Sequence, residues 1–513
     1  VRVDGKAYLV PEFWERQPRR ITVTATEVVL TLFEGAEPLR AGEDVWDRFA
    51  ILDATLADAT ALAETDALPI LPAAERQALM ARFAMTAQGL SGPDPEAEAA
   101  LRQYDRWQGT SWDKAYATDN PYTWWAGEEL STKTTLFSLF RRGLYYPIKA
   151  PQTYAWRDYG DIQWADGMSA GHYDWVRAAL KHYLKTGNLE ALRWGMAAVR
   201  SAVSVDHTWA SPKTPALNDW TNLAGLARYE KGDHGGVDFV ARPTHSWLEG
   251  LFLAATLTGD PWVREAAIDM AEGDWRFWGG STPVFANGAP GSWAELGGEV
   301  RIMGWPLLAM VVAFRETGNL KYWTKAQELM KALYDEEGVW GRQGYIADRS
   351  DWSSPNNAYA FLLGYSTRGM LAFADTAIAR GEWPSAYEAF LQRVGRWLTT
   401  PVPNGPYYPP TPGSPGAFAF YWCPPSLACA IPTSDPEVAH NPIMVDLLAW
   451  LATRDPATWR PIARQVFKDY VYYSAYPDPA IVGFLTNQYP TTETKILGWM
   501  QLFGDRAAAW LHQ

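Results

Sequence analysis

The chain has 513 residues, of which 48% are apolar and 20% are charged, and its formal net charge is −13. This composition is typical of a folded globular protein and excludes a mainly disordered chain. The negative charge argues against a nucleic-acid partner, because binding to phosphates depends on lysine and arginine. The sequence has no run of about 18 uncharged apolar residues, so no membrane span is predicted.

The chain begins with sequence that is typical of strands. Residues 19–33 (RRITVTATEVVLTLF) alternate apolar and polar side chains and are rich in β-branched residues. They predict a β region over residues 1–55, interpreted as the end of a β-sandwich domain. Because the sequence opens at Val1 without an apolar leader, we interpret it as a mature or truncated form.

A helical connector is predicted over residues 56–120. This part is rich in alanine, which favours helix, and Pro69 and Pro72 are expected to interrupt it.

A repeated unit follows in residues 121–513. Each copy consists of an apolar helix, a turn of the form TG[ND] and a more amphipathic helix. Glycine supplies the left-handed residue that ends one helix, and the next residue caps the following helix. The turns KTGN, LTGD and ETGN and the looser copies ATRD and LFGD end at Asn188, Asp260, Asn319, Asp455 and Asp505.

The number of units predicts the fold class. Hairpins are expected to start near residues 172, 245, 301, 356, 440 and 492, which gives about six units. Because the last unit is short, residues 128–142 are expected to help close a ring. Apolar inner helices and amphipathic outer helices predict a mainly α fold, an (α/α)6 toroid of helical hairpins preceded by a small β region. An open helical solenoid is the alternative.

Histidines are concentrated in one part of the chain. Five of the seven lie between residues 172 and 245, in segments that mix charged residues, aromatic residues and glycines without a period. Such sequence is typical of loops that lead into helices, and in a toroid these loops surround one mouth of the ring. The predicted catalytic residues, all from these segments, are His172, Tyr173, His207, His234 and His245.

His245 and Glu249 are four residues apart, so on a helix they would share a face. The positive amino-terminal end of that helix favours an anionic ligand such as a uronate carboxylate. Alternatively, Glu249 only anchors His245 within the core. Arg242 and Arg301 precede helices and could bind a carboxylate with two hydrogen bonds, or pair with structural acids.

Tyr173, Arg177 and Lys181 form a second ladder at four-residue spacing, which we interpret as a solvated helix face, so Lys181 is set aside. The sequence contains 28 tryptophans and 25 tyrosines, whose rings can stack on sugars or fill a large helical core. Both interpretations stay open, and sugar stacking is favoured for rings in loops. The predicted substrate-binding residues are Trp164, Asp174, Trp209, Arg242, Trp247, Glu249, Arg301 and Trp305.

No metal or cofactor is predicted, because no histidine or cysteine pair has the usual zinc spacing. The segment DYGD at residues 158–161 is compatible with a structural calcium. Cys423 and Cys429 lie six residues apart in a proline-rich loop, and a disulfide between them is compatible with this spacing but not required by it.

Three segments, GDIQWADGMSAGHYDWVRAALKHYLKTGN, SVDHTWA and THSWLEGLFLAATLTGD, resemble the helical domain of the exo-rhamnogalacturonan lyase-like family of polysaccharide lyases. The strand region followed by LRAGEDVWDRFAIL resembles the end of that family's preceding β domain. The resemblance covers roughly residues 19–50 and 125–330. It implies an (α/α)6 barrel with β modules that acts on acidic polysaccharide, and this substrate class implies a secreted or periplasmic protein. Much of the family's β domain has no counterpart here, and its catalytic residues cannot be matched one by one.

These observations predict a carbohydrate-active enzyme that cleaves an acidic, uronate-containing polysaccharide or oligosaccharide by β-elimination. Histidine suits the base, tyrosine the acid, and arginine the group that neutralises the substrate carboxylate. One alternative is a glycoside hydrolase on the same toroid that uses a carboxylate pair. Candidates for that pair are Asp158, Asp161, Asp166, Asp174, Asp238, Glu249, Glu295 and Glu299. The second alternative is a non-catalytic carbohydrate-binding or surface-assembly protein, and the oligomeric state is left open.

Overall fold

The computed structural model describes twenty ranges of the chain. They are residues 2–3, 6–10, 20–24, 26–31, 50–52, 70–83, 163–164, 167–168, 174–207, 209, 228–230, 239–241, 246–279, 300–347, 356–412, 416–429, 431–437, 441–474, 502–504 and 506–507.

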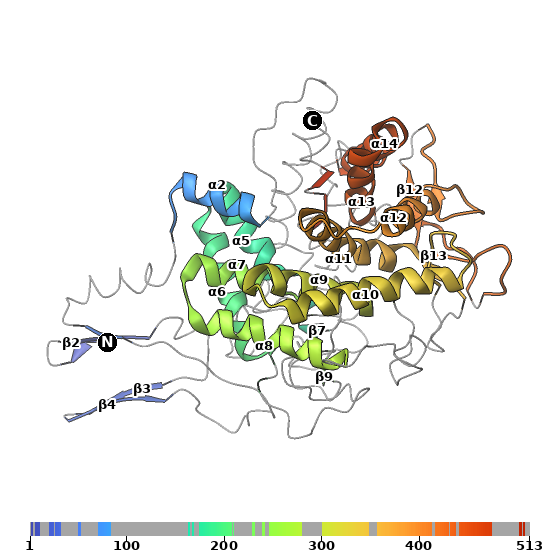
Figure 1. The fold of residues 1–513 in the computed structure, drawn as a ribbon. Helices are drawn as coiled ribbons and strands as arrows, with labels where there is room; N and C mark the ends of the chain where they lie inside the picture. Colours follow the sequence, from blue (N-terminus) through green and yellow to red (C-terminus); the bar gives the residue numbers. More distant parts are fainter. Residues whose placement is uncertain are drawn as a thin grey trace.

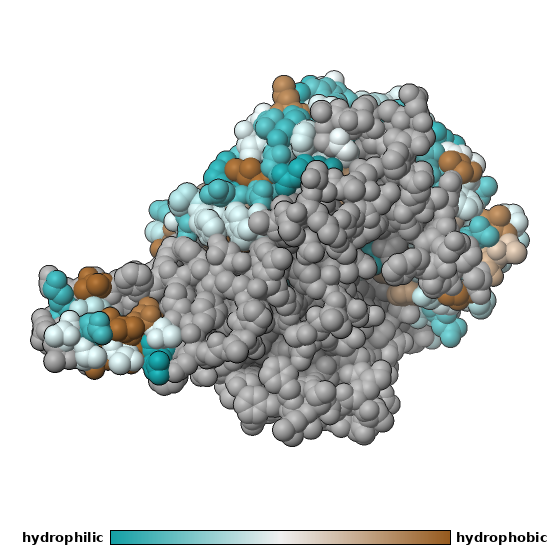
Figure 2. Space-filling model, turned by 90° about the horizontal axis from the view of Figure 1, so that it is seen from below, coloured by the Kyte–Doolittle hydropathy of each residue, from teal (hydrophilic) through white to brown (hydrophobic). Residues whose placement is uncertain are grey.

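The amino-terminal region forms antiparallel strands, as predicted. Strand β2 (Lys6–Leu9) pairs with β1 (Arg2–Val3) on one side and β5 (Ala50–Leu52) on the other. The alternating sequence forms a hairpin of β3 (Arg20–Val23) and β4 (Val28–Thr31), with Ile21 opposite Leu30. These strands lie to one side of the helical body (Figure 1). Apolar side chains remain on their surface, with Val23 45% exposed. Figure 2 shows brown atoms on the projecting part of the molecule.

Helix α2 (Ala73–Arg82) lies in the predicted connector and begins directly after Pro72. Its Met80 is buried, and Arg82 pairs with Glu316 at 2.7 Å. The backbone N–H of Leu71 donates to the hydroxyl of Tyr183 at 2.7 Å. The connector helix therefore packs on the first hairpin. The three domain boundaries stay a prediction.

Helical hairpins dominate the rest of the described chain, and five of them follow one another there (Figure 1). They are α5 (Trp175–Thr186) with α6 (Leu189–Ser204), α7 (Glu249–Thr258) with α8 (Pro261–Phe277), α9 (Arg301–Thr317) with α10 (Leu320–Val339), α11 (Ala360–Ala379) with α12 (Ser385–Leu398), and α13 (Asn441–Arg454) with α14 (Pro456–Ser474).

The first helices of the hairpins form an inner layer, because α5 contacts α7, α7 contacts α9, α9 contacts α11 and α11 contacts α13. Fifteen of the twenty residues of α11 are buried, whereas α12 buries one face, as expected for inner and outer helices. The mainly α class and the hairpin pattern of an α/α toroid are thereby confirmed. The expected hairpin near residue 492 and residues 128–142 lie outside the described residues. None of the described helices is both long enough and apolar enough to cross a membrane.

The predicted turns join the two helices within a hairpin. The glycines have positive φ angles of 78°, 68° and 71° at Gly187, Gly259 and Gly318. The residue after each glycine caps the following helix, as predicted, because its side chain accepts a backbone N–H of that helix. These capping residues are Asn188, Asp260 and Asn319. The threonine before each glycine also accepts the backbone N–H of the capping residue, which the sequence did not reveal. These threonines are Thr186, Thr258 and Thr317.

Short antiparallel strands lie in the connections that lead to the inner helices. The pairs are β6 (Gln163–Trp164) with β7 (Gly167–Met168), β8 (Arg228–Glu230) with β9 (Phe239–Ala241), and β10 (Ala358–Tyr359) with β13 (Tyr421–Trp422). Strand β12 (Ala417–Ala419) lies between β11 (Tyr407–Tyr408) and β14 (Pro436–Glu437).

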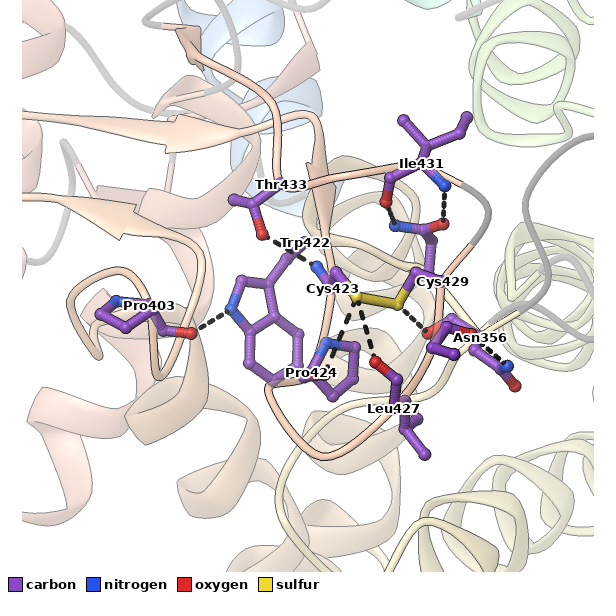
Figure 3. The surroundings of a disulfide bond; sticks show 11 residues. Asn356, Pro403, Trp422, Cys423, Pro424, Leu427, Cys429, Ile431 and Thr433 are labelled. Atoms are coloured by element: carbon purple, nitrogen blue, oxygen red, sulfur yellow. Dashed lines mark hydrogen bonds between the residues drawn. A yellow bond between two sulfur atoms is a disulfide. The ribbon is translucent and has the colours of Figure 1, made fainter.

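A disulfide joins Cys423 and Cys429, the pair that the sequence left open (Figure 3). The loop that it closes lies against the residues that precede α11. The side-chain amide of Asn357 donates to the carbonyl of Ile431 at 2.8 Å and accepts the N–H of Ile431 at 3.2 Å. The amide of Asn356 donates to the carbonyl of Ala428 at 2.9 Å. The disulfide loop is therefore fixed beside the start of an inner helix.

Candidate functional site

An ion cluster connects three inner helices around Glu249, the first residue of α7. The Oε2 atom of Glu249 accepts a hydrogen bond from Nε of Arg368 on α11 at 3.1 Å and is also contacted by Nη2 of Arg368. The Nε atom of Arg177 on α5 lies 3.8 Å from the same oxygen. Because α9 lies between α7 and α11 in the inner layer, this contact joins two inner helices that are not neighbours in that layer.

The arginines determine the ionisation of Glu249. Burial opposes its ionisation, but the positive charges of Arg368 and Arg177 hold its pKa below the usual value. Burial likewise opposes the charge of Arg368, but Glu249 holds the pKa of that guanidinium above its usual value. The pair is therefore fully charged in the folded protein, and removing one partner would leave an uncompensated charge.

Asp174 joins the starts of α5 and α7. It has a left-handed backbone with φ of 50°, and Oδ1 caps α5 by accepting the N–H of Arg177 at 3.0 Å. Its Oδ2 accepts the N–H of Gly250 on α7, also at 3.0 Å. A Cβ atom at Gly250 would lie 2.2 Å from the Oδ1 atom of Asp174, so glycine permits this close approach. Burial, followed by the negative charge of Glu249, raises the pKa of Asp174 to about 6.

A chain of aromatic rings runs from the start of α7 to the ion cluster. The rings of Trp247 and Trp305 are 4.8 Å apart, and Tyr365 lies 5.6 Å from both Trp305 and Phe503. The guanidinium of Arg368 lies 5.7 Å from the ring of Phe503. Trp247 and Trp305, both predicted to bind substrate, are only 4% and 1% exposed. They are therefore part of the core that packs beneath the starts of α7 and α9.

Arg301, another predicted substrate-binding residue, begins α9 and lies 6.0 Å above the ring of Trp305. The structure therefore brings Asp174, Glu249, Trp247, Arg301 and Trp305 together in one continuous region at the starts of the inner helices.

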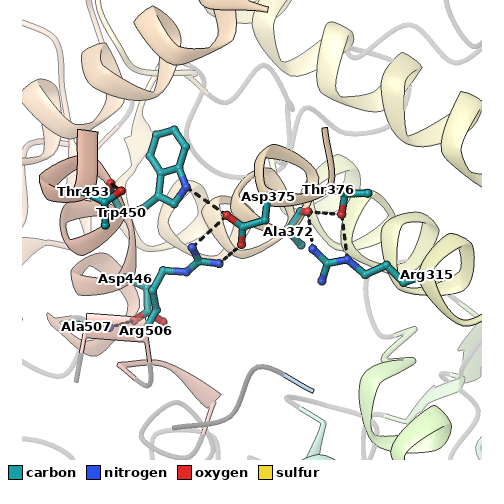
Figure 4. A network of polar contacts seen from close by, with 9 residues as sticks. All are labelled: Arg315, Ala372, Asp375, Thr376, Asp446, Trp450, Thr453, Arg506 and Ala507. Atoms are coloured by element: carbon teal, nitrogen blue, oxygen red, sulfur yellow. Dashed lines mark hydrogen bonds and ion pairs between the residues drawn. The ribbon is translucent and has the colours of Figure 1, made fainter. Parts of the chain in front are cut away.

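Residues 502–504 and 506–507 are attached to the inner helices. Figure 4 shows Arg506 and Ala507 beside Asp375 and Asp446. The backbone N–H groups of Gly504 and Ala507 donate to Asp446 of α13, each at 3.0 Å. Arg506 pairs with Asp375 of α11, which also accepts from the indole of Trp450 at 3.3 Å. Since Arg368 also donates to the carbonyl of Leu502, the ion cluster is connected to the carboxyl-terminal segment.

His207 and Trp209 lie elsewhere, among the outer helices. The Nε2 atom of His207 is 3.0 Å from Oδ2 of Asp269 on α8, and the imidazole is fully buried. The ring of Trp209 lies 4.4 Å from both His207 and Trp262 of α8. Their described partners therefore belong to the outer layer, whereas those of Glu249 belong to the inner one.

Several predicted site residues lie outside the described residues: His172, Tyr173, His234, Arg242 and His245. Trp164 is described only as part of β6. The roles of all predicted catalytic and substrate-binding residues, and their gathering around one opening, therefore stay predictions.

Two interpretations of helix faces are wrong. Helix α7 begins at Glu249, and residues 246–248 are not helical, so no helical face joins His245 to Glu249. Arg177 and Lys181 are 3% and 2% exposed, so their ladder is buried rather than solvated. Helices α2, α6 and α7 pack against α5, which its own sequence could not reveal.

The sequence did not single out Arg368 or Asp274. The signal for Arg368 is a single arginine within the apolar run AFLLGYSTRGMLAFADTAIA of α11. Asp274 is fully buried on α8 and accepts a hydrogen bond from the hydroxyl of Ser246 at 3.1 Å. Burial raises the pKa of Asp274 well above its usual value.

Within the described ranges, no three histidine, cysteine, aspartate or glutamate side chains are placed to hold a metal ion. The segment DYGD lies outside those ranges, so the predictions about calcium and cofactors are not tested.

The chain matches no protein-family model and none of the curated proteins. Among solved structures it is similar to a chain described as "Glycosyl hydrolase family 88 from Bacteroides vulgatus". The identity is 10% and the TM-score 0.39, over 67% of this chain and 91% of that chain. An identity and a TM-score this low carry no argument about the function.

Proposed function

We propose that the protein is a carbohydrate-active enzyme that cleaves an acidic, uronate-containing polysaccharide or oligosaccharide by β-elimination. One observation carries the proposal: the starts of α5 and α7 meet at the Arg177–Glu249–Arg368 cluster beside the Trp247–Trp305 pair. In the sequence, His172 and Tyr173 directly precede the start of α5, and His245 precedes the start of α7. The cluster and the ring pair are largely buried, so they support the proposal by fixing these segments next to each other, and Arg242 and Arg301 are the positive groups proposed to recognise the anionic sugar.

The reaction requires three groups. A base removes the proton at C5 of the uronate, the electrons of that bond form a C4–C5 double bond, and the C4–O bond breaks. The leaving oxygen then takes a proton from an acid. We assign the base to His172, His234 or His245, since His207 is buried against an outer helix. Tyr173 is the proposed acid, and Arg242 or Arg301 would neutralise the carboxylate.

Product analysis tests the proposal. The protein would be incubated with a panel of acidic and neutral polysaccharides, and the products examined by ultraviolet absorbance and mass. Elimination yields an unsaturated product that absorbs ultraviolet light and is lighter by one water than the hydrolysis product. Products of full hydrolytic mass without absorbance would contradict elimination.

Hydrolysis is the second candidate, and one observation favours it. The pKa of Asp174 is raised and that of Glu249 is lowered, and such divergence is typical of an acid and a base in a glycosidase. Against this role, both oxygens of Asp174 accept backbone N–H groups. A non-catalytic carbohydrate-binding protein would give neither product and would keep its binding after His245→Ala.

We also propose a secreted or periplasmic location. The Cys423–Cys429 disulfide supports it, because disulfides persist mainly in oxidising compartments.

A further inference from the structure

We propose that Asp174 is a positioning residue that holds the starts of α5 and α7 at a fixed separation, instead of contacting the saccharide. This inference rests on the proposed function, because the two segments that Asp174 joins directly follow the predicted catalytic residues of the reaction.

The two oxygens of Asp174 serve two different helices. One accepts the N–H of Arg177 on its own helix, and the other accepts the N–H of Gly250, 76 residues further along the chain. Capping alone does not require a carboxylate, because Asn319 caps α10 by accepting the N–H of Lys321 with one amide oxygen. The second oxygen of Asp174 is therefore the part that links the helices.

The packing leaves little freedom at this link. A Cβ atom at Gly250 would lie 2.5 Å from the backbone nitrogen of Arg177, so the two helix starts are in direct contact. The left-handed φ of 50° at Asp174 aims its side chain from the helix start toward α7. Such backbone strain persists where surrounding structure enforces it, often at functional sites.

The link should depend on pH. A protonated carboxyl group can still accept both N–H groups, because its hydrogen can occupy another lone-pair site. Since burial raises the pKa of Asp174 to about 6, separation of the two helix starts, which returns the carboxylate to water, becomes easier as the pH rises through 6. The charged groups that face Asp174 are Arg177 of α5, Glu249 of α7 and Arg368 of α11. Arg368 in turn faces Asp446 of α13.

A change in the separation of the two helix starts would displace His172 and Tyr173 relative to His245. Reaction rates depend steeply on such geometry, and a displacement of about 1 Å can lower turnover by about 10²-fold. The affinity for a long saccharide should change less than turnover, because the saccharide is also bound by other groups.

The test uses Asp174→Asn in the full-length protein. Asparagine tolerates the left-handed backbone and keeps one oxygen for the cap, but it presents an NH₂ group where the other oxygen was. The matched control is Asp455→Asn, because Asp455 caps α14 by accepting the N–H of Thr458 at 3.2 Å. Kinetics are measured on the saccharide that the product analysis identifies, and amide hydrogen exchange is measured on residues 246–252.

We expect Asp174→Asn to lower kcat by about 10- to 100-fold with a much smaller change in KM, and to speed exchange in residues 246–252. Asp455→Asn should leave both unchanged. A rise in KM at constant kcat would show that Asp174 contacts the saccharide and would overturn the proposal, as would unchanged exchange. If no saccharide is cleaved, the proposed function fails, and exchange still tests the link.

If Asp174→Asn does not fold, the wild-type protein provides the second measurement. After correction for intrinsic exchange, residues 246–252 should be less protected at pH 7.5 than at pH 5, because opening returns the ionised carboxylate of Asp174 to water, while the first turn of α14 should not change. Equal or greater protection at pH 7.5 would overturn the proposal.

Discussion

The two ends of the inner helices are held by different kinds of contact. At the turn end, Gly187, Gly259 and Gly318 and their neighbours form hydrogen bonds between residues two to four positions apart. At the site end, the partners are 76 residues apart for Asp174 and Gly250 and 119 apart for Arg368 and Glu249. The TG[ND] turns thus define each hairpin locally, and Arg82 and Arg264 add longer contacts to Glu316 beside them. At the site end, contacts between distant residues fix the hairpins relative to one another.

This difference has an energetic consequence. A lost contact at the turn end should loosen a single hairpin at a cost of about 1 kcal/mol, because the freed amide can bind water. A lost contact at the site end leaves a charge or a polar group buried between several helices, which costs more.

Arg368→Met tests the ion cluster directly. The substitution leaves the charge of Glu249 without its main partner, and breaking a buried pair in this way costs about 3–5 kcal/mol. The matched control is Lys331→Met, since Lys331 pairs with Asp335 on the surface of α10, where the side chains are 65% and 52% exposed. That pair should contribute less than about 0.5 kcal/mol. Both values follow from denaturant unfolding, and equal losses would show that the site end is no more tightly coupled than an exposed helix.

Asp174→Asn tests whether the stability of the site end, unlike that of the turn end, depends on pH. The pKa of Asp174 rises from 3.8 to about 6 on folding, so its contribution to stability is fully present below about pH 4 and is lost as the pH rises through 6. The ionised carboxylate loses more solvation on burial than the two N–H groups return. The difference in unfolding free energy between the wild type and the variant should therefore fall by about 3 kcal/mol over this range.

Unfolding curves at pH 4, 5, 6 and 7 measure this difference. The lowered pKa of Glu249 gives the opposite trend, with stability lost as the pH falls, but Glu249 is present in both proteins and its effect largely cancels. A difference that is flat between pH 4 and 7 would mean that Asp174 titrates like an exposed carboxyl group.

The contrast also explains what the sequence could predict. The TG[ND] turns were predicted because glycine and the capping residue act on neighbours in the chain, and hairpin spacing followed from them. The strand pair around Ile21 and Leu30 was likewise visible as a two-residue period. Both features depend on local rules that a single sequence contains.

The site end could be predicted only in part. Asp174, Glu249, Trp247, Arg301 and Trp305 were selected for their chemistry, but their partners were not. Arg368 is the single arginine in an apolar helix, and no feature of the neighbouring sequence connects it with Glu249. The faces of α5 were misjudged for the same reason, since contacts from α2 and α7 decide which side chains of α5 are buried.

The disulfide gives an intermediate case, with a short loop that supports long-range contacts. Cys423→Ser with Cys429→Ser should lower the unfolding free energy by about 2 kcal/mol, because closing a loop of this length removes little entropy from the unfolded chain. Hydrogen exchange near Asn357 should rise, since its amide pairs with Ile431 beyond the loop. Reductant should destabilise the wild type to the same extent and leave the double variant unaffected. Any effect of reductant on the double variant would show that the lost stability does not come from the disulfide.

Asn319→Ala has the smallest expected effect and tests how local the turn end is. Its side chain accepts the N–H of Lys321 at 3.1 Å, so removing it should cost about 1 kcal/mol, whereas Asn319→Asp keeps the acceptor and should be nearly neutral. Hydrogen exchange should accelerate in the first turn of α10 and stay unchanged at residues 246–252. If exchange at the start of α7 also rose, the two ends would be coupled through α9, and the separation between local turns and long-range site contacts would not hold.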